Sequence, residues 1–295
     1  MIKIFRGLPV MVLLALCVLP GTPIQAADVK AAEVKARAWW WDEAWWSEGK
    51  LDAVQNYPVE HQKRSYKNGD VEVPVHVFRP KGKEKFPGVL YVHGRRGLDE
   101  QVQGPALRLA ARGFVVYAPD LYFGRGIAQW PLEHDPVIED DLNKGLDALL
   151  ALSDIKGKKV CVMGISRGGY YSLKLAVTKK RQEHDLACYL GYFPVMVDPN
   201  APEPVQVYGY APEVESLTLP VLIFHGEHEQ YHRKRAAETS VGILKKRGVP
   251  VQLVEYPGVG RGFNLRGEEI RVFADDLASK DAMQRATKFI LHHLK

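Results

Sequence analysis

The feature that most constrains this chain is the stretch 159–169, which reads KVCVMGISRGG. Its apolar half is typical of a buried strand, and a helical pattern follows over 170–179. Together they predict a sharp strand–turn–helix that holds the hydroxyl of Ser166 above the edge of a sheet. Gly164 and Gly168 are expected where any side chain would collide with the neighbouring strand or helix. The free N–H groups at the helix start would lie beneath an anion formed at this serine.

The first 26 residues have the pattern of a secretory signal peptide. Lys3 and Arg6 precede an apolar run over 8–19, and small residues lead to Ala26 and Ala27. The apolar run is shorter than the stretch of about 20 residues that spans a membrane. We therefore expect cleavage near Ala26 or Ala27, a periplasmic or secreted protein, and no stable membrane anchor.

Charge and cysteine content exclude some classes of protein. The net charge of +5 falls to +3 without the leader, and the basic residues are spread along the chain. A nucleic-acid-binding protein would concentrate them in a patch, so no nucleic-acid partner is expected. Cys161 and Cys188 both lie in apolar, strand-like runs. We expect them to be buried free thiols, with no disulfide framework.

Residues 27–60 form a separate segment rich in tryptophan. A helical pattern covers 28–46, and it ends in five of the six tryptophans of the chain: Trp39, Trp40, Trp41, Trp45 and Trp46. One interpretation is a helix that docks its aromatic face on the main domain. The others are an aromatic lid, or a platform for a membrane surface or a sugar, which would make the protein a carbohydrate esterase.

Residues 61–295 have the pattern of a single α/β domain. An Asn68-Gly69 hairpin comes first, and strands and helices then alternate. Strands are expected over 88–93, 113–118, 159–163, 185–192, 220–224 and 251–256, with helices over 100–112, 137–152, 233–247 and 273–294. The alternation predicts a mostly parallel, doubly wound sheet with helices on both faces. Ligands of such sheets bind at the carboxyl ends of the strands.

Several segments, in this order, resemble the dienelactone hydrolase family of α/β-hydrolases. They are VHGRRGL at 92–98, APDLY at 118–122, the serine motif, FHGEHE at 224–229 and YPG at 256–258. The resemblance covers roughly residues 60–295. It implies the α/β-hydrolase fold, cleavage of a small ester or lactone, and no cofactor. Many members of the family carry cysteine as the nucleophile, where this chain has Ser166.

The resemblance also implies roles for individual residues. Ser166 takes the place of the nucleophile, and the backbone N–H groups of Arg95 and Arg167 match the oxyanion hole. Glu229 stands at the acidic position, where the family usually has aspartate. Glu227 is a less favoured substitute because it lies closer to the strand end.

The expected base is missing. The family places its histidine in a glycine-rich loop after the last strand, and the corresponding stretch 259–263 reads VGRGF, with Arg261 at that position. A guanidinium with a pKa above about 12 cannot accept the serine proton at neutral pH. The base would then come from elsewhere. His228 is the first candidate because it shares a loop with Glu229, and His93 and His232 follow.

Arginines recur on the loops expected around the serine. Arg96, Arg125 and Arg261 are predicted to bind substrate, together with Arg95 and Arg167 beside the elbow. Because arginine pairs with carboxylates, their convergence predicts an anionic substrate. The alternative is that several form salt bridges with nearby acids. The mixed His and Glu cluster over 225–232 matches no zinc signature, and no metal is expected.

Two functions follow from these patterns. The leading hypothesis is an exported serine hydrolase of the dienelactone hydrolase type that cleaves a small ester or lactone, anionic or neutral, through Ser166. The alternative is a catalytically impaired relative that binds an anionic small molecule or a partner. The intact serine motif favours catalysis, and Arg261 favours binding.

Overall fold

The computed structural model describes residues 56–267 and 269–295. The signal peptide and the tryptophan-rich helix of the sequence analysis lie outside the described residues. The first described strand begins at Val59, two residues before the expected start of the hydrolase domain. Among the described residues, no helix is both long and apolar enough to cross a membrane.

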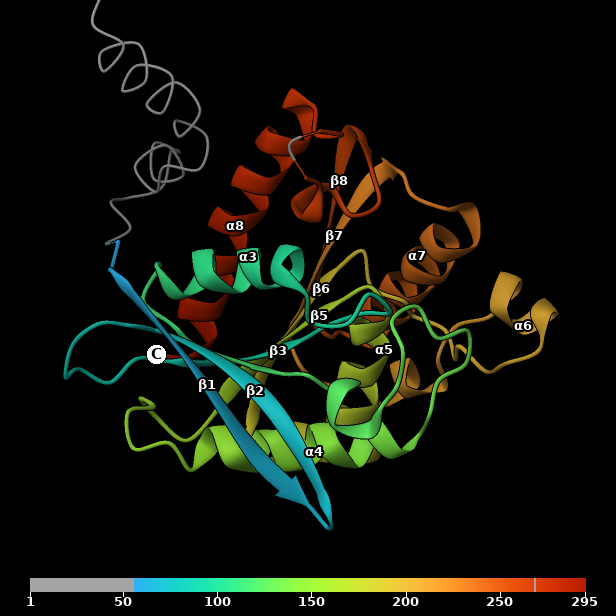
Figure 1. Cartoon of the computed structure of the whole chain (residues 1–295). Coiled ribbons are helices and arrows are strands. Elements are labelled where there is room, and N and C mark those ends of the chain that lie inside the picture. The colour runs from blue at the N-terminus through green and yellow to red at the C-terminus, as the bar shows by residue number, and fades with distance from the viewer. Residues whose placement is uncertain (1–55, 268) are drawn as a thin grey trace, which may run out of the picture. The chain divides into compact units, whose positions relative to one another are not determined.

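The described domain is built on an eight-stranded sheet in the order β1-β2-β4-β3-β5-β6-β7-β8 (Figure 1). The strands are β1 (Val59–Asn68), β2 (Val71–Pro80), β3 (Gly88–Val92), β4 (Val115–Pro119), β5 (Val160–Ile165), β6 (Leu186–Tyr192), β7 (Val221–His228) and β8 (Val251–Gly260). The hairpin β1–β2 and the pair β2–β4 are antiparallel, and every other pair is parallel. The mostly parallel sheet of the sequence analysis is confirmed.

Helices cover both faces of this sheet. The α-helices are α3 (Glu100–Ala110), α4 (Val137–Leu150), α5 (Arg167–Leu173), α6 (Glu203–Tyr208), α7 (Tyr231–Lys246) and α8 (Phe273–His293). Figure 1 shows α3 and α8 on one side of the sheet and α4, α5 and α7 on the other. Each side has its own apolar core, with Leu109 and Ala282 in one and Leu142 and Leu244 in the other. Both cores follow from strands that are apolar on two faces.

The last two strands run further than their apolar pattern indicates. β7 continues to His228 and β8 to Gly260, and these two residues are register partners. Glu227 and His228 are exposed, so no hydrophobic periodicity marks this end of β7. The extension matters because Glu229 and Arg261 directly follow the two strand ends.

Cys161 and Cys188 form a disulfide, which corrects the expectation of free thiols. The two residues are register partners on the parallel strands β5 and β6, and both are buried. The pairing depends on the register of strands 27 residues apart, which no local pattern reveals. Closing a loop of this length constrains the unfolded chain and contributes about 3.5 kcal/mol to stability in the chain-entropy model.

Candidate functional site

Ser166 occupies a strained turn between β5 and α5. Its φ is 55° and its ψ is −121°, a conformation that few residues other than glycine adopt. The turn is closed by glycines, as the sequence predicts. A Cβ on Gly164 would lie 2.5 Å from the carbonyl oxygen of Gly168, and one on Gly168 would lie 2.2 Å from that of Val92. The sharp strand–turn–helix predicted around Ser166 is confirmed.

Arg261 bridges Ser166 and Glu229. Its Nη2 donates to Ser166 Oγ at 2.7 Å, and its Nη1 donates to Glu229 Oε2 at 2.7 Å. The other carboxylate oxygen, Oε1, accepts from the N–H of Gln230 at 2.9 Å. The Glu229 side chain is fully buried. The structure therefore joins the predicted nucleophile and acid through a guanidinium, in the place where a base is expected.

The surroundings of Arg261 hold its side chain in a fixed position. Its Cζ lies 5.2 Å from the centre of the Phe193 ring, a distance typical of a cation–π contact. Burial lowers the pKa of Arg261, while the Glu229 carboxylate acts in the opposite direction. The group remains a cation near neutral pH and can donate hydrogen bonds but accept none.

Two backbone N–H groups beside Ser166 are suited to an oxyanion. Arg167 is the first residue of α5, so its N–H has no partner within the helix. Arg95 lies in the loop after β3, and neither N–H donates a hydrogen bond within the described residues. The Arg95 loop comes close to the nucleophile: a Cβ on Gly94 would lie 3.1 Å from Ser166 Oγ. The predicted oxyanion pair is compatible with this geometry.

A cavity of about 430 Å³ opens above the serine. Its wall includes the loop after β3, the first turn of α3, the Ser166 turn and the segment between β8 and α8. The lining residues are Gly94, Arg95, Arg96, Gln101, Val102, Trp130, Ile165, Ser166, Phe193, Arg261, Gly262, Leu265, Arg266 and Ile270. Four of them are arginines and none is acidic; Arg96, Arg261 and Arg266 pair with carboxylates behind the wall, and Arg95 pairs with none within the described residues. This composition favours a small ligand with a negative charge.

The predicted substrate arginines differ in their contacts. Arg96 lines the cavity and also pairs with Asp99. Arg125 binds buried Asp141 through Nε–Oδ2 at 2.5 Å and Nη2–Oδ1 at 2.7 Å, and it does not line the cavity. Because its guanidinium is held by that carboxylate, we remove Arg125 from the substrate site. The salt-bridge alternative describes it better.

The Arg167 side chain has a supporting role. It points away from Ser166 and donates to the carbonyl oxygens of Pro131, Leu132 and Glu133 at 2.8–3.1 Å. These carbonyls belong to the loop that also carries Trp130. Arg167 therefore anchors this loop next to the elbow.

The candidate histidines are not hydrogen-bonded to the serine within the described residues. His228 is exposed at the end of β7, and no hydrogen bond joins it to Ser166 or Glu229. His93 is buried: its Nδ1 donates to the Gly94 carbonyl, and its Nε2 accepts from the Leu121 N–H. With both ring nitrogens used, His93 is a structural residue.

Two residues near the site, Trp130 and Arg233, were missed from the sequence. Trp130 lines the cavity with a φ of 64°, and its N–H donates to the Arg95 carbonyl at 2.7 Å. Arg233, at the start of α7, makes no ion pair within the described residues. Burial and the nearby cation of Arg261 lower the pKa of Arg233 to about 10. His232, the third candidate base of the sequence analysis, lies close enough to Glu229 and Arg261 to feel their charges, and burial lowers its pKa. The only sequence signal for Trp130 and Arg233 is their position, in a loop after a predicted strand and at the start of a predicted helix.

His225 makes folding stability sensitive to acid. Burial, reinforced by the charges of Arg261 and Lys234, lowers the pKa of His225 to about 3. Between pH 6.5 and 3 the unfolded chain binds a proton at His225 that the folded chain does not. The free energy of unfolding therefore falls by about 1.4 kcal/mol for each unit by which the pH is lowered in this range. In urea unfolding between pH 7 and 4, His225→Asn should lose less stability than the native chain. His184→Asn, at an exposed histidine, is the control, and equal slopes for His225→Asn and the native chain would contradict the prediction.

Comparison with known proteins identifies the family. The model of the dienelactone hydrolase family matches residues 73–294. The chain belongs to the dienelactone hydrolase family. A Salmonella typhimurium protein, named as a candidate carboxymethylenebutenolidase, is 23% identical over 235 residues, which cover 75% of this chain and 83% of that protein. The resemblance stated from the sequence is thereby confirmed.

Solved structures agree on the fold. A candidate dienelactone hydrolase from Klebsiella pneumoniae has a TM-score of 0.63 at 21% identity, covering 79% of this chain and 99% of its own. A bacterial brefeldin A esterase has a TM-score of 0.63 at 18% identity, covering 94% and 88%. The fold is therefore the α/β-hydrolase fold.

Among the described residues, no group of three or more histidine, cysteine or acidic side chains is arranged to hold a metal.

Proposed function

We propose that this member of the dienelactone hydrolase family hydrolyses a small ester or lactone that carries an anionic group. The observation that carries the proposal is Ser166, held on a strained turn at the base of an arginine-lined cavity. Strain of this kind persists only where the surrounding structure enforces it, and it is concentrated at functional sites. The intact oxyanion pair supports the same proposal.

The cavity supports the anionic part of the proposal. Arg95 has no carboxylate partner within the described residues; its Nη2 donates only to the Trp130 carbonyl at 3.0 Å. Arg261 has one carboxylate partner, Glu229, and Arg233 adds a cation nearby. The excess of cations over acids leaves room for a substrate carboxylate. Trp130 offers an apolar wall for the rest of a small substrate.

Arg261 suggests how the serine becomes a nucleophile without a neighbouring histidine. A guanidinium that donates to Oγ stabilises the alkoxide more than the hydroxyl. Hydroxide from solvent would take the Oγ proton and form water, and the alkoxide would add to the substrate carbonyl. The N–H groups of Arg95 and Arg167 would hold the oxyanion. Collapse expels the alcohol oxygen, which takes a proton from water, and a second water molecule hydrolyses the acyl-serine.

His228 is the base in the competing route. Its side chain would have to turn from solvent toward Ser166 when substrate binds. Glu229 would then have to leave Arg261 in order to orient it. A histidine base typically contributes 10²- to 10⁴-fold in rate. The two routes therefore differ in both pH dependence and sensitivity to His228.

The pH dependence of fluorophosphonate labelling tests the proposal. We expect the labelling rate to rise about tenfold per unit between pH 7 and 9, because the alkoxide fraction grows with hydroxide. His228→Ala should change the rate by less than about threefold. If His228 is the base, the labelling rate of the native chain should level off above about pH 7. The His228→Ala variant should then lack this plateau and label at least about 10²-fold more slowly.

The second candidate function is binding without turnover. It is favoured by Arg261, because the same side chain occupies both the serine hydroxyl and the Glu229 carboxylate. In that case the arginines would bind an anionic ligand, and Ser166 would be one of its hydrogen-bond donors. Absence of labelling at every pH, with retained binding of a small carboxylate such as benzoate, would support this function.

We also propose that the protein is exported. The leader pattern of residues 1–26 is the first support. The disulfide between Cys161 and Cys188 is the second, because disulfides persist in oxidising compartments such as the periplasm.

A further inference from the structure

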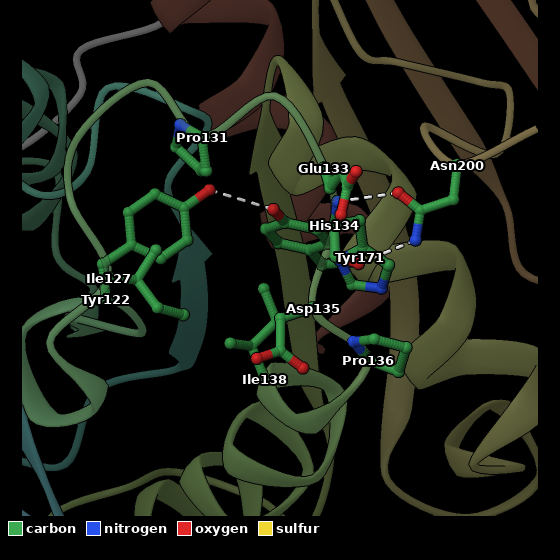
Figure 2. A pocket seen from close by; sticks show the side chains of 10 residues that line it. All are labelled: Tyr122, Ile127, Pro131, Glu133, His134, Asp135, Pro136, Ile138, Tyr171 and Asn200. Carbon is green, nitrogen blue, oxygen red and sulfur yellow. Dashed lines mark hydrogen bonds between the residues drawn. The ribbon is translucent and has the colours of Figure 1, made fainter.

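A second cavity, of about 460 Å³, shares no lining residue with the Ser166 cavity. Its wall is formed by the loop after β4, the start of α4, the helix that follows Ser166 and the segment between β6 and α6. Figure 2 shows the lining residues, which are Tyr122, Ile127, Pro131, Glu133, His134, Asp135, Pro136, Ile138, Tyr171 and Asn200. The hydroxyl groups of Tyr122 and Tyr171 are 3.0 Å apart. The reaction proposed at Ser166 makes no use of this cavity.

The charge of this cavity is opposite to that of the Ser166 cavity. Glu133 and Asp135 line it and no lysine or arginine does; Arg167 lies behind the wall, with its guanidinium on the carbonyl oxygens of Pro131 and Glu133. The Glu133 carboxylate makes no hydrogen bond or ion pair within the described residues. Asp135 Oδ1 accepts from the Val137 N–H at 3.0 Å and keeps its other oxygen available. A ligand with a positive charge is therefore favoured here.

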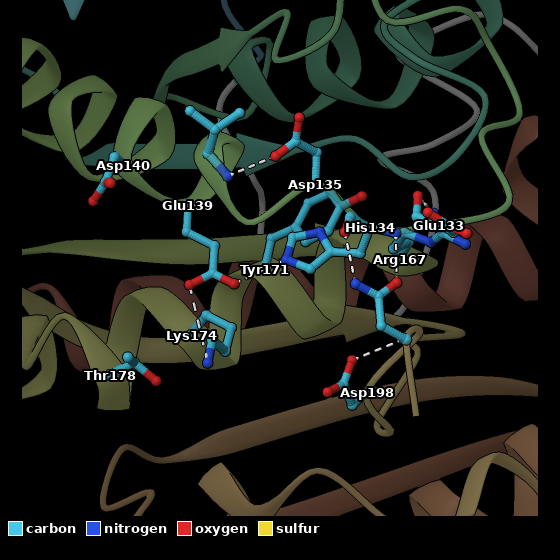
Figure 3. A network of polar contacts seen from close by, with 12 residues as sticks. Glu133, His134, Asp135, Glu139, Asp140, Arg167, Tyr171, Lys174, Thr178 and Asp198 are labelled. Carbon is cyan, nitrogen blue, oxygen red and sulfur yellow. Dashed lines mark hydrogen bonds and ion pairs between the residues drawn. The ribbon is translucent and has the colours of Figure 1, made fainter. Parts of the chain in front are cut away.

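His134 adds a buried acceptor to the same wall. It is 4% exposed, its Nε2 lies 2.8 Å from Glu139 Oε1, and its ring stacks on Tyr171 with centres 5.0 Å apart (Figure 3). In the neutral tautomer that gives its Nε2–H to the carboxylate, the ring presents a lone pair at Nδ1. This Nδ1 is buried and has no hydrogen-bond partner within the described residues. A donor on a ligand would satisfy it, since an unpaired buried polar atom is costly.

The wall is held in place before any ligand arrives. Asn200 accepts from the His134 N–H at 2.8 Å and donates to the His134 carbonyl at 2.7 Å. Arg167 holds the preceding carbonyls of the same loop, including those of Pro131 and Glu133. Small-molecule sites are commonly preformed in this way, with apolar walls and a few polar groups.

We propose that this cavity binds a small organic ammonium ion with an apolar body. The body would lie against Tyr122, Ile127 and Tyr171. The ammonium would donate to the acceptors of the opposite wall, and the charges of Glu133 and Asp135 would favour it over a neutral or anionic ligand. The proposal does not depend on Ser166 being catalytic.

Benzylammonium, benzyl alcohol and benzoate are matched probes, to be titrated into the mature chain by calorimetry or by chemical-shift changes. We expect benzylammonium to bind about tenfold more tightly than benzyl alcohol, as two ion contacts would give. Glu133→Gln combined with Asp135→Asn should remove that advantage. The new amide oxygen at position 135 can still accept from the Val137 N–H, so the loop keeps its hydrogen bond. Glu203→Gln, an exposed acid on α6, should leave the advantage unchanged.

A variant that fills the cavity locates the binding. Ile127→Trp should abolish binding of benzylammonium, while circular dichroism verifies that the variant is folded. Equal affinity for benzylammonium and benzyl alcohol would overturn the proposal, as would binding that survives in folded Ile127→Trp. Neither result would bear on Ser166, whose labelling is measured separately.

Discussion

Replacing Ser166 by alanine is expected to abolish covalent labelling by a fluorophosphonate and to reduce ester hydrolysis by roughly 10³-fold or more. The expectation rests on the strained turn, which holds Oγ beside the Arg95 loop and at the start of α5. Intact mass gives the stoichiometry of labelling directly. One adduct per chain, lost in Ser166→Ala, would identify the nucleophile.

The matched control for this variant is an exposed serine far from the elbow in sequence. Ser216 lies between the short 3₁₀-helix η4 (Pro212–Glu215) and β7, and Ser216→Ala should label like the native chain. An adduct that persists in Ser166→Ala would place the nucleophile elsewhere. No adduct in the native chain at any pH would favour the binding function.

The second large effect is expected from Arg261→His, which should raise ester hydrolysis at neutral pH by about 10²- to 10⁴-fold, the usual contribution of a general base. Glu229 is already buried and directed toward position 261, with Arg261 Nη1 at 2.7 Å from Oε2. An imidazole at this position would complete a Ser–His–Glu triad. The measurement is kcat/KM for a small activated ester as a function of pH, where the gain should follow a group with a pKa near about 6.5.

Two further variants separate a new base from the loss of a cation. Arg261→Gln removes the charge without supplying a base, so it should not reproduce the gain. Ser166→Ala combined with Arg261→His should be inactive. If Arg261→Gln and Arg261→His had equal activity, a triad would not have formed. A loss of activity in both would support the role in alkoxide stabilisation proposed for Arg261 and would show that no triad had formed.

Much of the scaffold was predictable because its signals are local. The continuous apolar strands indicate a parallel sheet, and the glycines around Ser166 indicate the elbow. The arginine at position 261 could also be read directly, because the surrounding motif defines its place after the last strand. These predictions depend on neighbours in the chain, so no tertiary information was required.

Predictions that depend on partners distant in sequence were wrong in two cases and stay untested in two others. The prediction of free thiols was wrong because the register of β5 and β6 places Cys161 next to Cys188. Arg125 was assigned to substrate, but Asp141, 16 residues away on α4, holds it. His228 stays a candidate base without a contact to Ser166, and the role of the tryptophan-rich segment stays a prediction.

The amino-acid sequence alone determined the sheet type, the serine turn, the family and the loss of the expected histidine, because each is written in short-range pattern and motif. Only the tertiary structure decided that Arg261 reaches both Ser166 and Glu229, and that a second, acidic cavity lies beside the first. Those outcomes depend on how strand ends and loops converge and on which charges pair when they do. Hydrophobic periodicity specifies the core but carries no information about such pairings at the surface of a cavity.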